Sequence, residues 1–206
     1  KDQRMKSEKA QKMIEERGWI RKALEFEDIL KRLAHIPSYT SPAEKSYLYE
    51  LAKSLEPDSV VVEIGTGWGY NALLMALANP EIRVYGIDLF DPSWDIWQGE
   101  SEPFKAVAKE VDSLCKNVYL RQGEATFWAD RWSDLPVSVL IHDALHRKDA
   151  VVRDILAFKP ALTKTSQVLI HDYHIGEVKE AVSELESSGF KMTKLVDRFV
   201  VLRLDH

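Results

Sequence analysis

The sequence predicts an α/β fold in which a mostly parallel sheet carries helices on both faces and ends in an antiparallel hairpin. From residue 59 onward, short runs that are apolar on both faces alternate with helical stretches, as in parallel sheets whose strands are joined by helices. The last two apolar runs are separated only by Asp197 and Arg198, too few residues for a crossover connection. We therefore expect these two runs to pair antiparallel at one edge of the sheet.

The chain before this alternating region divides into a helical segment and a turn. Apolar residues recur at helical spacing between residues 3 and 34, with an expected break at Gly18. Residues 37–42, rich in Pro, Ser and Thr, end this segment. We assign residues 1–36 to an N-terminal helical segment that acts as a lid or a dimerisation surface, and residues 37–206 to the main domain.

Each element of the main domain follows from a local pattern. Ser41, Pro42 and Glu44 predict an N-cap, a proline at the first helical position and an early acid for a helix over 43–55. Apolar runs predict strands over 60–64, 83–87, 117–121, 137–141, 167–170, 191–196 and 199–204. Helical periodicity predicts helices over 71–78, 104–114, 147–162 and 177–188.

The composition excludes several classes of protein. The 206 residues are 45% hydrophobic and 30% charged, which describes one globular domain with a sizeable core. The longest apolar runs are strand-sized, well short of the roughly 18 to 20 residues of a membrane helix. The single Cys115 excludes an internal disulfide and indicates a reducing, cytoplasmic compartment. A formal net charge of -5 without a basic block argues against nucleic acid as a partner.

The most informative segment is the turn after the first strand of the main domain, VVVEIGTGWGY. Gly65, Gly67 and Gly69 lie between a buried strand and a helix, where backbone amides and a helix N-terminus converge on a ligand. Glu63 precedes the first glycine by two residues, where a carboxylate suits an ammonium group and repels a pyrophosphate. Asp88, at the end of the next strand, can accept both hydroxyls of a ribose. A nucleoside joined to an amino acid, as in S-adenosylmethionine, satisfies both acids.

This turn resembles the first motif of the class I S-adenosylmethionine-dependent methyltransferases, acid-x-G-x-G-x-G, and the resemblance covers about residues 36–206. It implies a Rossmann-like, seven-stranded sheet with a C-terminal antiparallel hairpin, which agrees with the hairpin inferred above. Glycines that serve packing alone, or that bind a dinucleotide diphosphate, are the alternatives, and neither accounts for both acids. The cofactor-binding residues that the resemblance implies are Glu63, Gly65, Thr66, Gly67, Gly69, Asn71, Asp88, Leu89, Gly123, Glu124, Ala125 and Asp143.

Two neighbouring strands each deliver a His-Asp pair to the same edge of the predicted sheet. His142 and Asp143 follow the fourth strand, and His171 and Asp172 follow the fifth. Adjacent parallel strands lie about 4.8 Å apart, so carboxylates at equivalent strand ends can chelate one cation or share a proton. Four of the six histidines are expected to cluster here: His142, His146, His171 and His174.

The pattern resembles a subset of small-molecule O-methyltransferases, including the catechol and caffeoyl-CoA enzymes and the sugar O-methyltransferases of macrolide and aminocoumarin biosynthesis. The resemblance implies that Asp143 and Asp172 hold a divalent metal such as Mg, Mn or Fe. Tyr173 stands where catechol-type enzymes have Asn, and His171 stands where the sugar enzymes have an acid. We assign His171 as the third ligand, which makes the set softer than the all-oxygen sets that magnesium prefers.

A metal would assist deprotonation of the acceptor, since S-adenosylmethionine is already an activated methyl donor. A divalent cation lowers the pKa of a bound hydroxyl and fixes its geometry. We assign His146 as the general base, with His174 as second choice, because the ordinary pKa of histidine lies near neutral pH. Asp143 is counted as catalytic through the metal. Two alternatives stay open. The acids could form hydrogen bonds without a metal, and His146 could simply face water.

Three functional hypotheses follow. The first is methylation of a small hydroxylated molecule with metal assistance, and the second is a metal-independent methyltransferase with a histidine base. The third is a regulatory domain that binds the cofactor without turnover, since a chain that begins with Lys1 is compatible with a domain cut from a longer protein. Trp94 and Trp97, in the insertion after the second strand, either wall the acceptor pocket or anchor the loop. The expected partners are the acceptor and, through the N-terminal helices, a second copy of the chain, but neither nucleic acid nor a membrane.

Overall fold

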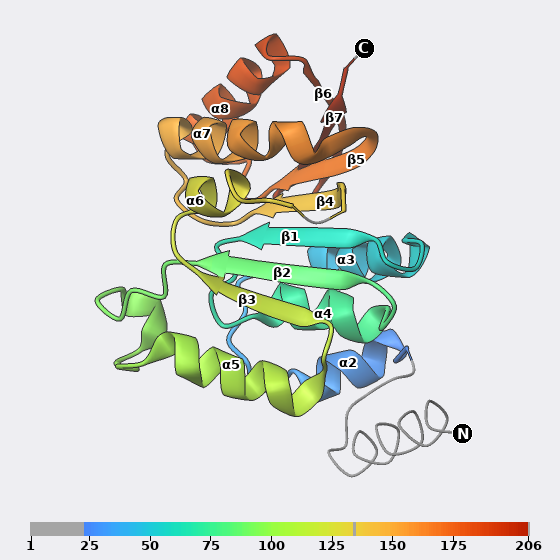
Figure 1. Ribbon diagram of the computed structural model, residues 1–206, viewed down its shortest axis with the longest axis vertical. Helices are drawn as coiled ribbons and strands as arrows, with labels where there is room; N and C mark the ends of the chain where they lie inside the picture. The colour runs from blue at the N-terminus through green and yellow to red at the C-terminus, as the bar shows by residue number, and fades with distance from the viewer. Residues whose placement is uncertain (1–22, 134, 206) are drawn as a thin grey trace.

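The computed structural model describes residues 23–133 and 135–205 and contains one seven-stranded sheet (Figure 1). The strands are β1 Val60–Ile64, β2 Arg83–Asp88, β3 Val118–Gln122, β4 Val137–His142, β5 Leu162–Ile170, β6 Phe190–Val196 and β7 Phe199–Leu204. Their order is β3-β2-β1-β4-β5-β7-β6. Strands β1 to β5 pair parallel, whereas β7 runs antiparallel to both β5 and β6. The predicted fold class, including the C-terminal hairpin, is confirmed.

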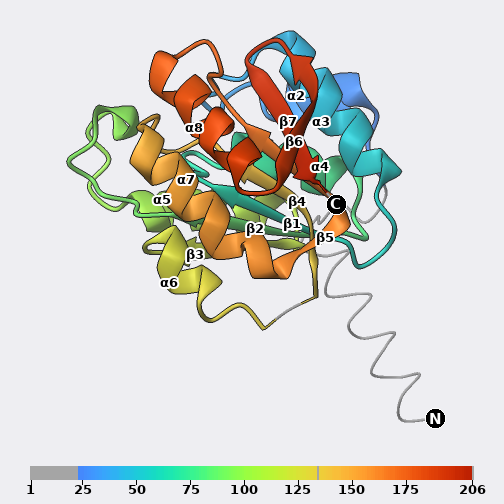
Figure 2. The ribbon, with the colours of Figure 1, turned by 90° about the horizontal axis from the view of Figure 1, so that it is seen from above.

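The helices cover both faces of this sheet (Figure 2). They are α2 Phe26–Arg32, α3 Pro42–Ser54, α4 Tyr70–Ala78, α5 Pro103–Leu114, α6 Ala125–Ala129, α7 Lys148–Phe158 and α8 Gly176–Ser187, with 3₁₀ turns η1 Asp95–Trp97 and η2 Lys159–Ala161. Within the described residues, no helix has the length and apolarity needed to span a membrane.

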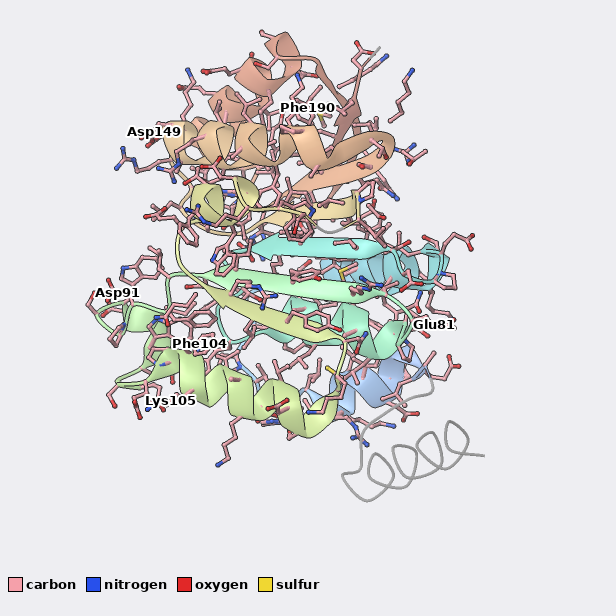
Figure 3. The ribbon with its side chains drawn as sticks, in the orientation of Figure 1. Glu81, Asp91, Phe104, Lys105, Asp149 and Phe190 are labelled. Atoms are coloured by element: carbon pink, nitrogen blue, oxygen red, sulfur yellow. The ribbon has the colours of Figure 1, made fainter. Side chains whose placement is uncertain are left out.

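Two hydrophobic cores lie on opposite faces of the sheet because successive strand residues point to opposite sides. Val139 and Ile141 of β4 belong to the core beneath α2, α3, α4 and α5. Leu140, between them, belongs to the core beneath α6, α7 and α8. Phe104 and Phe190, both labelled in Figure 3, contribute to the first and the second core respectively.

The described part of the predicted N-terminal segment is built into the first core. Ile29 and Leu33 are fully buried there, and the backbone N–H of Leu24 donates to the carbonyl of Leu77 in α4. The predicted helix over 3–34 and its break at Gly18 lie largely outside the described residues. The boundary at residue 36 and the lid or dimer role stay predictions.

Most element boundaries agree with the predictions within one or two residues, and the exceptions have local causes. The helix predicted over 147–162 ends at Phe158, because Pro160 cannot continue it, and Leu162 instead begins a longer β5. Helix α6 and turn η1 were not predicted, since five and three residues are too short for a periodic signal.

The sheet has a topological switch point next to β1. From β1 the chain passes through β2 to β3 on one side, whereas β4 and β5 lie on the other side. In Figure 1 the arrowheads of β1, β2 and β3 point left, toward the edge where their C-terminal ends meet. Asp91 and Asp149 lie at this edge in Figure 3, and Glu81 lies at the opposite edge. Ligands of open α/β sheets bind in the crevice at such a switch point.

Candidate active site

A cavity of about 660 Å³ lies at the C-terminal edge of the strands. Its walls come from the glycine turn after β1, the end of β2, the insertion that follows β2, and the loops after β3 and β4. The predicted cofactor residues all line this cavity except Gly69. Gly69 is the N-cap of α4 in a left-handed conformation, and a Cβ atom there would meet Val107 of α5 at 3.3 Å. This glycine therefore serves packing between α4 and α5.

Gly65 allows the loop after β4 to come close to the glycine turn. Its φ is +84°, and an added Cβ atom would lie 2.2 Å from the carbonyl oxygen of Asp143. Only glycine tolerates both the conformation and the contact. From the sequence we expected Gly65 to let a ligand approach the backbone. The structure shows that it also sets the position of Asp143.

Glu63 is almost fully buried beneath the glycine turn, with both carboxylate oxygens engaged. Oε2 accepts from the Thr66 hydroxyl at 2.7 Å, and Oε1 accepts from the Asn71 amide at 3.0 Å. Asn71 in turn accepts from the Thr40 hydroxyl at 2.8 Å, which ties the turn before α3 to this network. Burial raises the pKa of Glu63 to about 8, against the effect of its two hydrogen bonds.

Asp88 ends β2 at the wall of the cavity. Its Oδ2 atom accepts from the backbone N–H of Gly67 at 3.0 Å, and its Oδ1 atom accepts from that of Phe90 at 2.8 Å. Burial raises the pKa of Asp88, although these hydrogen bonds oppose the shift. The carboxylate is thus fixed beside the glycine turn, where its remaining lone pairs can accept from a ligand.

The loop after β3 presents small and polar groups to the cavity. Gly123, Glu124 and Ala125 line it at the start of α6. The Trp128 indole N–H donates to the carbonyl of Gln122 at 3.2 Å, and this hydrogen bond anchors the loop. In the insertion after β2, Trp97 is buried against Phe90, and the cavity-lining Trp94 is 38% exposed. Trp97 thus anchors the insertion, although it also lines the cavity, and the role of Trp94 as a wall of the acceptor pocket stays a prediction.

Acidic and histidine side chains gather where β4 and β5 end. One ligand atom from each of Asp143, His146, His171 and Asp172 lies within 4.8 Å of all the others. Nδ1 of His171 is 3.0 Å from Oδ1 of Asp143 and 3.5 Å from Oδ2 of Asp172. Nε2 of His146 is 3.3 Å from the same Oδ2 atom. Of the four histidines and two acids expected here, the structure thus brings together both acids with His146 and His171, and their role as metal ligands stays a prediction.

His142 does not belong to this cluster, contrary to the prediction. The ladder pairs His142 with Ile170, so the two His-Asp pairs are staggered by one residue. His142 consequently points to the opposite face of the sheet, where its Nε2 lies 3.2 Å from Asp154 of α7. His174 is 62% exposed, and its Nδ1 lies 3.6 Å from Oδ1 of Asp172, the oxygen that faces away from His146.

Opposing effects set the charges of the cluster. Burial alone would lower the pKa of His171, but the carboxylates of Asp143 and Glu44 overcome it and raise this pKa to about 10. Burial would raise the pKa of Asp143, yet the His146 and His171 rings hold it well below its ordinary value. In the same way, the pKa of Glu44 is lowered to about 2 despite its burial, mainly by His171 and the Ser41 N–H.

The cluster also contains buried ring nitrogens without a hydrogen-bond partner. Among the described residues, three buried side-chain nitrogens lack a hydrogen-bond partner, and two of these are Nε2 of His146 and Nδ1 of His171. Both approach carboxylate oxygens without the alignment of a hydrogen bond. Asp172 has a positive φ of 55°, in the left-handed region that Asp adopts more readily than most residue types.

Two residues that the sequence did not assign to the site complete its surroundings. Glu44, predicted only as an early helical acid, lies 3.3 Å from Nε2 of His171. Arg198, predicted only as a hairpin residue, donates to Asp172 at 3.0 Å. Their separation of 154 residues leaves no local signal that could have joined them.

A family model described as a methyltransferase domain matches residues 62–173, which is more than half of the chain. The chain belongs to this methyltransferase family. The match spans the glycine turn, Asp88 and the Asp143 to Asp172 cluster, and it identifies the protein as an S-adenosylmethionine-dependent methyltransferase of class I. No curated protein sequence matches the chain.

Solved structures similar to this methyltransferase share its fold at low sequence identity. A cofactor-bound protein from MTB, Rv0187, has a TM-score of 0.66 at 15% identity, with 87% of this chain and 89% of that chain covered. An O-methyltransferase from Bacillus cereus in complex with SAH has a TM-score of 0.61 at 13% identity, with 87% and 90% covered. A TDP-rhamnose 3'-O-methyltransferase of calicheamicin biosynthesis has a TM-score of 0.58 at 16% identity, with 96% and 93% covered.

The cavity of the methyltransferase suits its cofactor. Asp88 lines the cavity beside the glycine turn, and the buried Glu63 lies beneath that turn, where a cationic group would favour its ionised form. The acid–histidine cluster lines the same cavity. The cluster and the predicted cofactor-binding residues therefore share one cavity.

Proposed function

We propose that this methyltransferase methylates a hydroxyl group of a small molecule, with a divalent cation held by Asp143, His171 and Asp172. The observation that carries the proposal is the convergence of two carboxylates and two unpartnered histidine nitrogens within 4.8 Å on the wall of the cofactor cavity. Carboxylate and imidazole ligands together suit Mn²⁺, Fe²⁺ or Zn²⁺ better than Mg²⁺.

The cation would lower the pKa of an acceptor hydroxyl and fix its orientation. The His146 side chain is 32% exposed, and its Nε2 atom, although buried, has no hydrogen-bond partner, which supports its assignment as the base that takes the hydroxyl proton. The acceptor oxygen then attacks the methyl carbon in line with the carbon–sulfur bond. That bond breaks, its electron pair stays on sulfur, and S-adenosylhomocysteine leaves with the methylated acceptor.

The rim of the cavity favours an acceptor with a flat or apolar body. Tyr39, Trp94 and Leu145 are exposed large hydrophobic residues that line the cavity. Exposed aromatic side chains provide stacking area for rings. The O-methyltransferases with a similar fold, one of them a TDP-rhamnose 3'-O-methyltransferase, support oxygen as the methylated atom.

The test uses S-adenosylhomocysteine formation with a catechol and with a TDP-sugar as probe acceptors. We expect EDTA to abolish turnover and Mn²⁺ or Fe²⁺ to restore it. We expect Asp172→Asn to bind S-adenosylhomocysteine normally in calorimetry but to lose turnover. Turnover that is indifferent to EDTA and to Asp172→Asn would contradict the metal and leave a metal-independent enzyme with a histidine base.

A second variant separates the two roles open to His146. If His146 is the base, His146→Ala lowers kcat by roughly 10²- to 10⁴-fold and leaves Mn²⁺ affinity unchanged. If the residue is instead a fourth metal ligand, Mn²⁺ affinity falls together with kcat.

A further inference from the structure

Two charged residues lie behind the acid–histidine cluster, and the proposed reaction does not use them. Glu44 is fully buried in the first turn of α3, and Arg198 lies in the turn between β6 and β7. We propose that Glu44 and Arg198 are positioning residues that orient His171 and Asp172 toward the cation. This inference rests on the proposed metal site.

Glu44 fixes which nitrogen of His171 faces the cavity. Its Oε2 atom lies 3.3 Å from Nε2 of His171, whereas Nδ1 lies near the oxygens of Asp143 and Asp172. A ring that donates its Nε2–H to Glu44 has its Nδ1 lone pair available for a cation. Metal-binding histidines commonly donate their second ring nitrogen to a carboxylate in this way. Phe199 packs on the His171 ring with a centroid distance of 4.8 Å and restricts its rotation further.

Arg198 binds one carboxylate oxygen of Asp172, and the other oxygen faces the cluster. Its Nη1 atom donates to Oδ1 at 3.0 Å. The other oxygen, Oδ2, is the one that lies near His146 and His171. The guanidinium also donates to the carbonyl of Tyr39 and, at 3.4 Å, to Oε2 of Glu44. One side chain thus joins a metal ligand, the turn before α3 and the carboxylate that holds His171.

Capping of α3 does not account for the surroundings of Glu44. A capping box needs only the reciprocal hydrogen bonds with Ser41, and an exposed acid satisfies it. Glu44 instead has no exposed surface and faces four donor groups. These are the backbone N–H groups of Ser41 and Arg198, at 2.7 and 3.0 Å, the Arg198 guanidinium and the His171 ring. A charge buried at this depth requires such partners, and they connect it to the site.

The experiment measures Mn²⁺ affinity by electron paramagnetic resonance of the free ion, with folding checked by circular dichroism. Glu44→Gln retains one oxygen, so an N–H₂ group must face either His171 or the Arg198 backbone. We expect Mn²⁺ affinity to fall by roughly 10- to 100-fold, as for other partners of metal ligands. Arg198→Gln removes the guanidinium that holds the Asp172 carboxylate, so we expect it to lower Mn²⁺ affinity as well.

Ser41→Ala is the matched control, because it removes the hydroxyl of the capping box but keeps the Glu44 carboxylate and the backbone N–H that contacts it. We expect its Mn²⁺ affinity to stay within twofold of the wild type. An equal loss in Ser41→Ala, or unchanged affinity in both Glu44→Gln and Arg198→Gln, would overturn the positioning role while the metal site stands. If Glu44→Gln fails to fold, the Mn²⁺ affinity of Arg198→Gln decides whether the positioning role stands. A wild-type protein that binds no Mn²⁺ would overturn the metal site itself.

NMR spectroscopy shows directly which nitrogen of the His171 ring is protonated and which binds the metal. In the Zn²⁺-bound wild type, ¹⁵N NMR should show His171 with a protonated Nε2 and a metal-bound Nδ1. Glu44→Gln should shift or broaden the Nε2–H signal, and Ser41→Ala should leave it in place. An Nε2-bound metal in the wild type would contradict the proposal.

Discussion

The ring of His171 and the carboxylate of Asp143 face each other from neighbouring strand ends, with Nδ1 of His171 3.0 Å from Oδ1 of Asp143. The stagger between β4 and β5 produces this pairing, because Ile170 rather than His171 lies opposite His142. Side chains alternate between the faces of a sheet, so two identical His-Asp dipeptides have different surroundings. His171 faces the cavity, and His142 is buried on the α7 side with Asp154.

The two histidines should therefore respond differently to truncation. His142→Ala removes the ring partner of Asp154, which keeps its ion pair with Arg153, and should destabilise the protein by about 1 to 3 kcal/mol. Mn²⁺ affinity of the folded variant should remain that of the wild type. His171→Ala should instead lower Mn²⁺ affinity. Urea unfolding and Mn²⁺ titration measure the two effects, and loss of Mn²⁺ binding in folded His142→Ala would contradict the assignment.

Gly65→Ala should destabilise the fold and displace Asp143. The added Cβ would meet the Asp143 carbonyl at 2.2 Å in a backbone conformation that favours glycine, so we expect a loss of about 2 kcal/mol or more. Gly176→Ala is the control, because an added Cβ there meets no atom within 4 Å. Urea unfolding of both variants provides the comparison. Equal stability of the two would contradict the close approach of the two loops.

Glu63 should make the stability of the ligand-free protein fall as pH rises. Burial raises its pKa from 4.5 to about 8, so between these values the folded state binds a proton that the unfolded state has released. The free energy of unfolding therefore decreases with rising pH across this window. Glu63→Gln removes this contribution. Urea unfolding at pH 5, 6, 7 and 8 should show a smaller decrease for the variant, and parallel curves would contradict the raised pKa.

Asp88→Ala should weaken cofactor binding. The substitution removes the acceptor placed for the ribose and the anchor of the Gly67 amide, and we expect roughly a 10- to 100-fold loss of S-adenosylhomocysteine affinity by calorimetry. Asp91→Ala, in the same loop, removes an exposed acid whose hydrogen bond is to Ser93 and should bind normally. Similar affinities for both variants would place the ribose elsewhere.

The fold could be predicted because its signals are local. The alternation of apolar runs and helical stretches defined the strands, and the short connection at Asp197 and Arg198 defined the hairpin. Pro160 also acts locally, since it ends the helix predicted over 147–162 at Phe158. The glycine turn and Asp88 lie where the strand-end rule places ligand sites.

The site was predicted only in part because its details depend on register and packing. Nothing in the two His-Asp dipeptides indicates a stagger of one residue, and the burial of His142 follows from it. Glu44 and Arg198 meet only after β7 has paired with β5 and α3 has packed on the sheet. The contact between Gly65 and Asp143 likewise joins two loops that are distant in sequence.

Asp143 and Asp172 are proposed to hold a divalent cation on the wall of the cofactor cavity. Titration of the wild-type protein with Mn²⁺, followed by electron paramagnetic resonance, tests it most directly. We expect one bound ion per chain in the wild type and no binding at the same concentrations in Asp143→Asn/Asp172→Asn. Equal Mn²⁺ binding by the folded double variant, or none by the wild type, would contradict it.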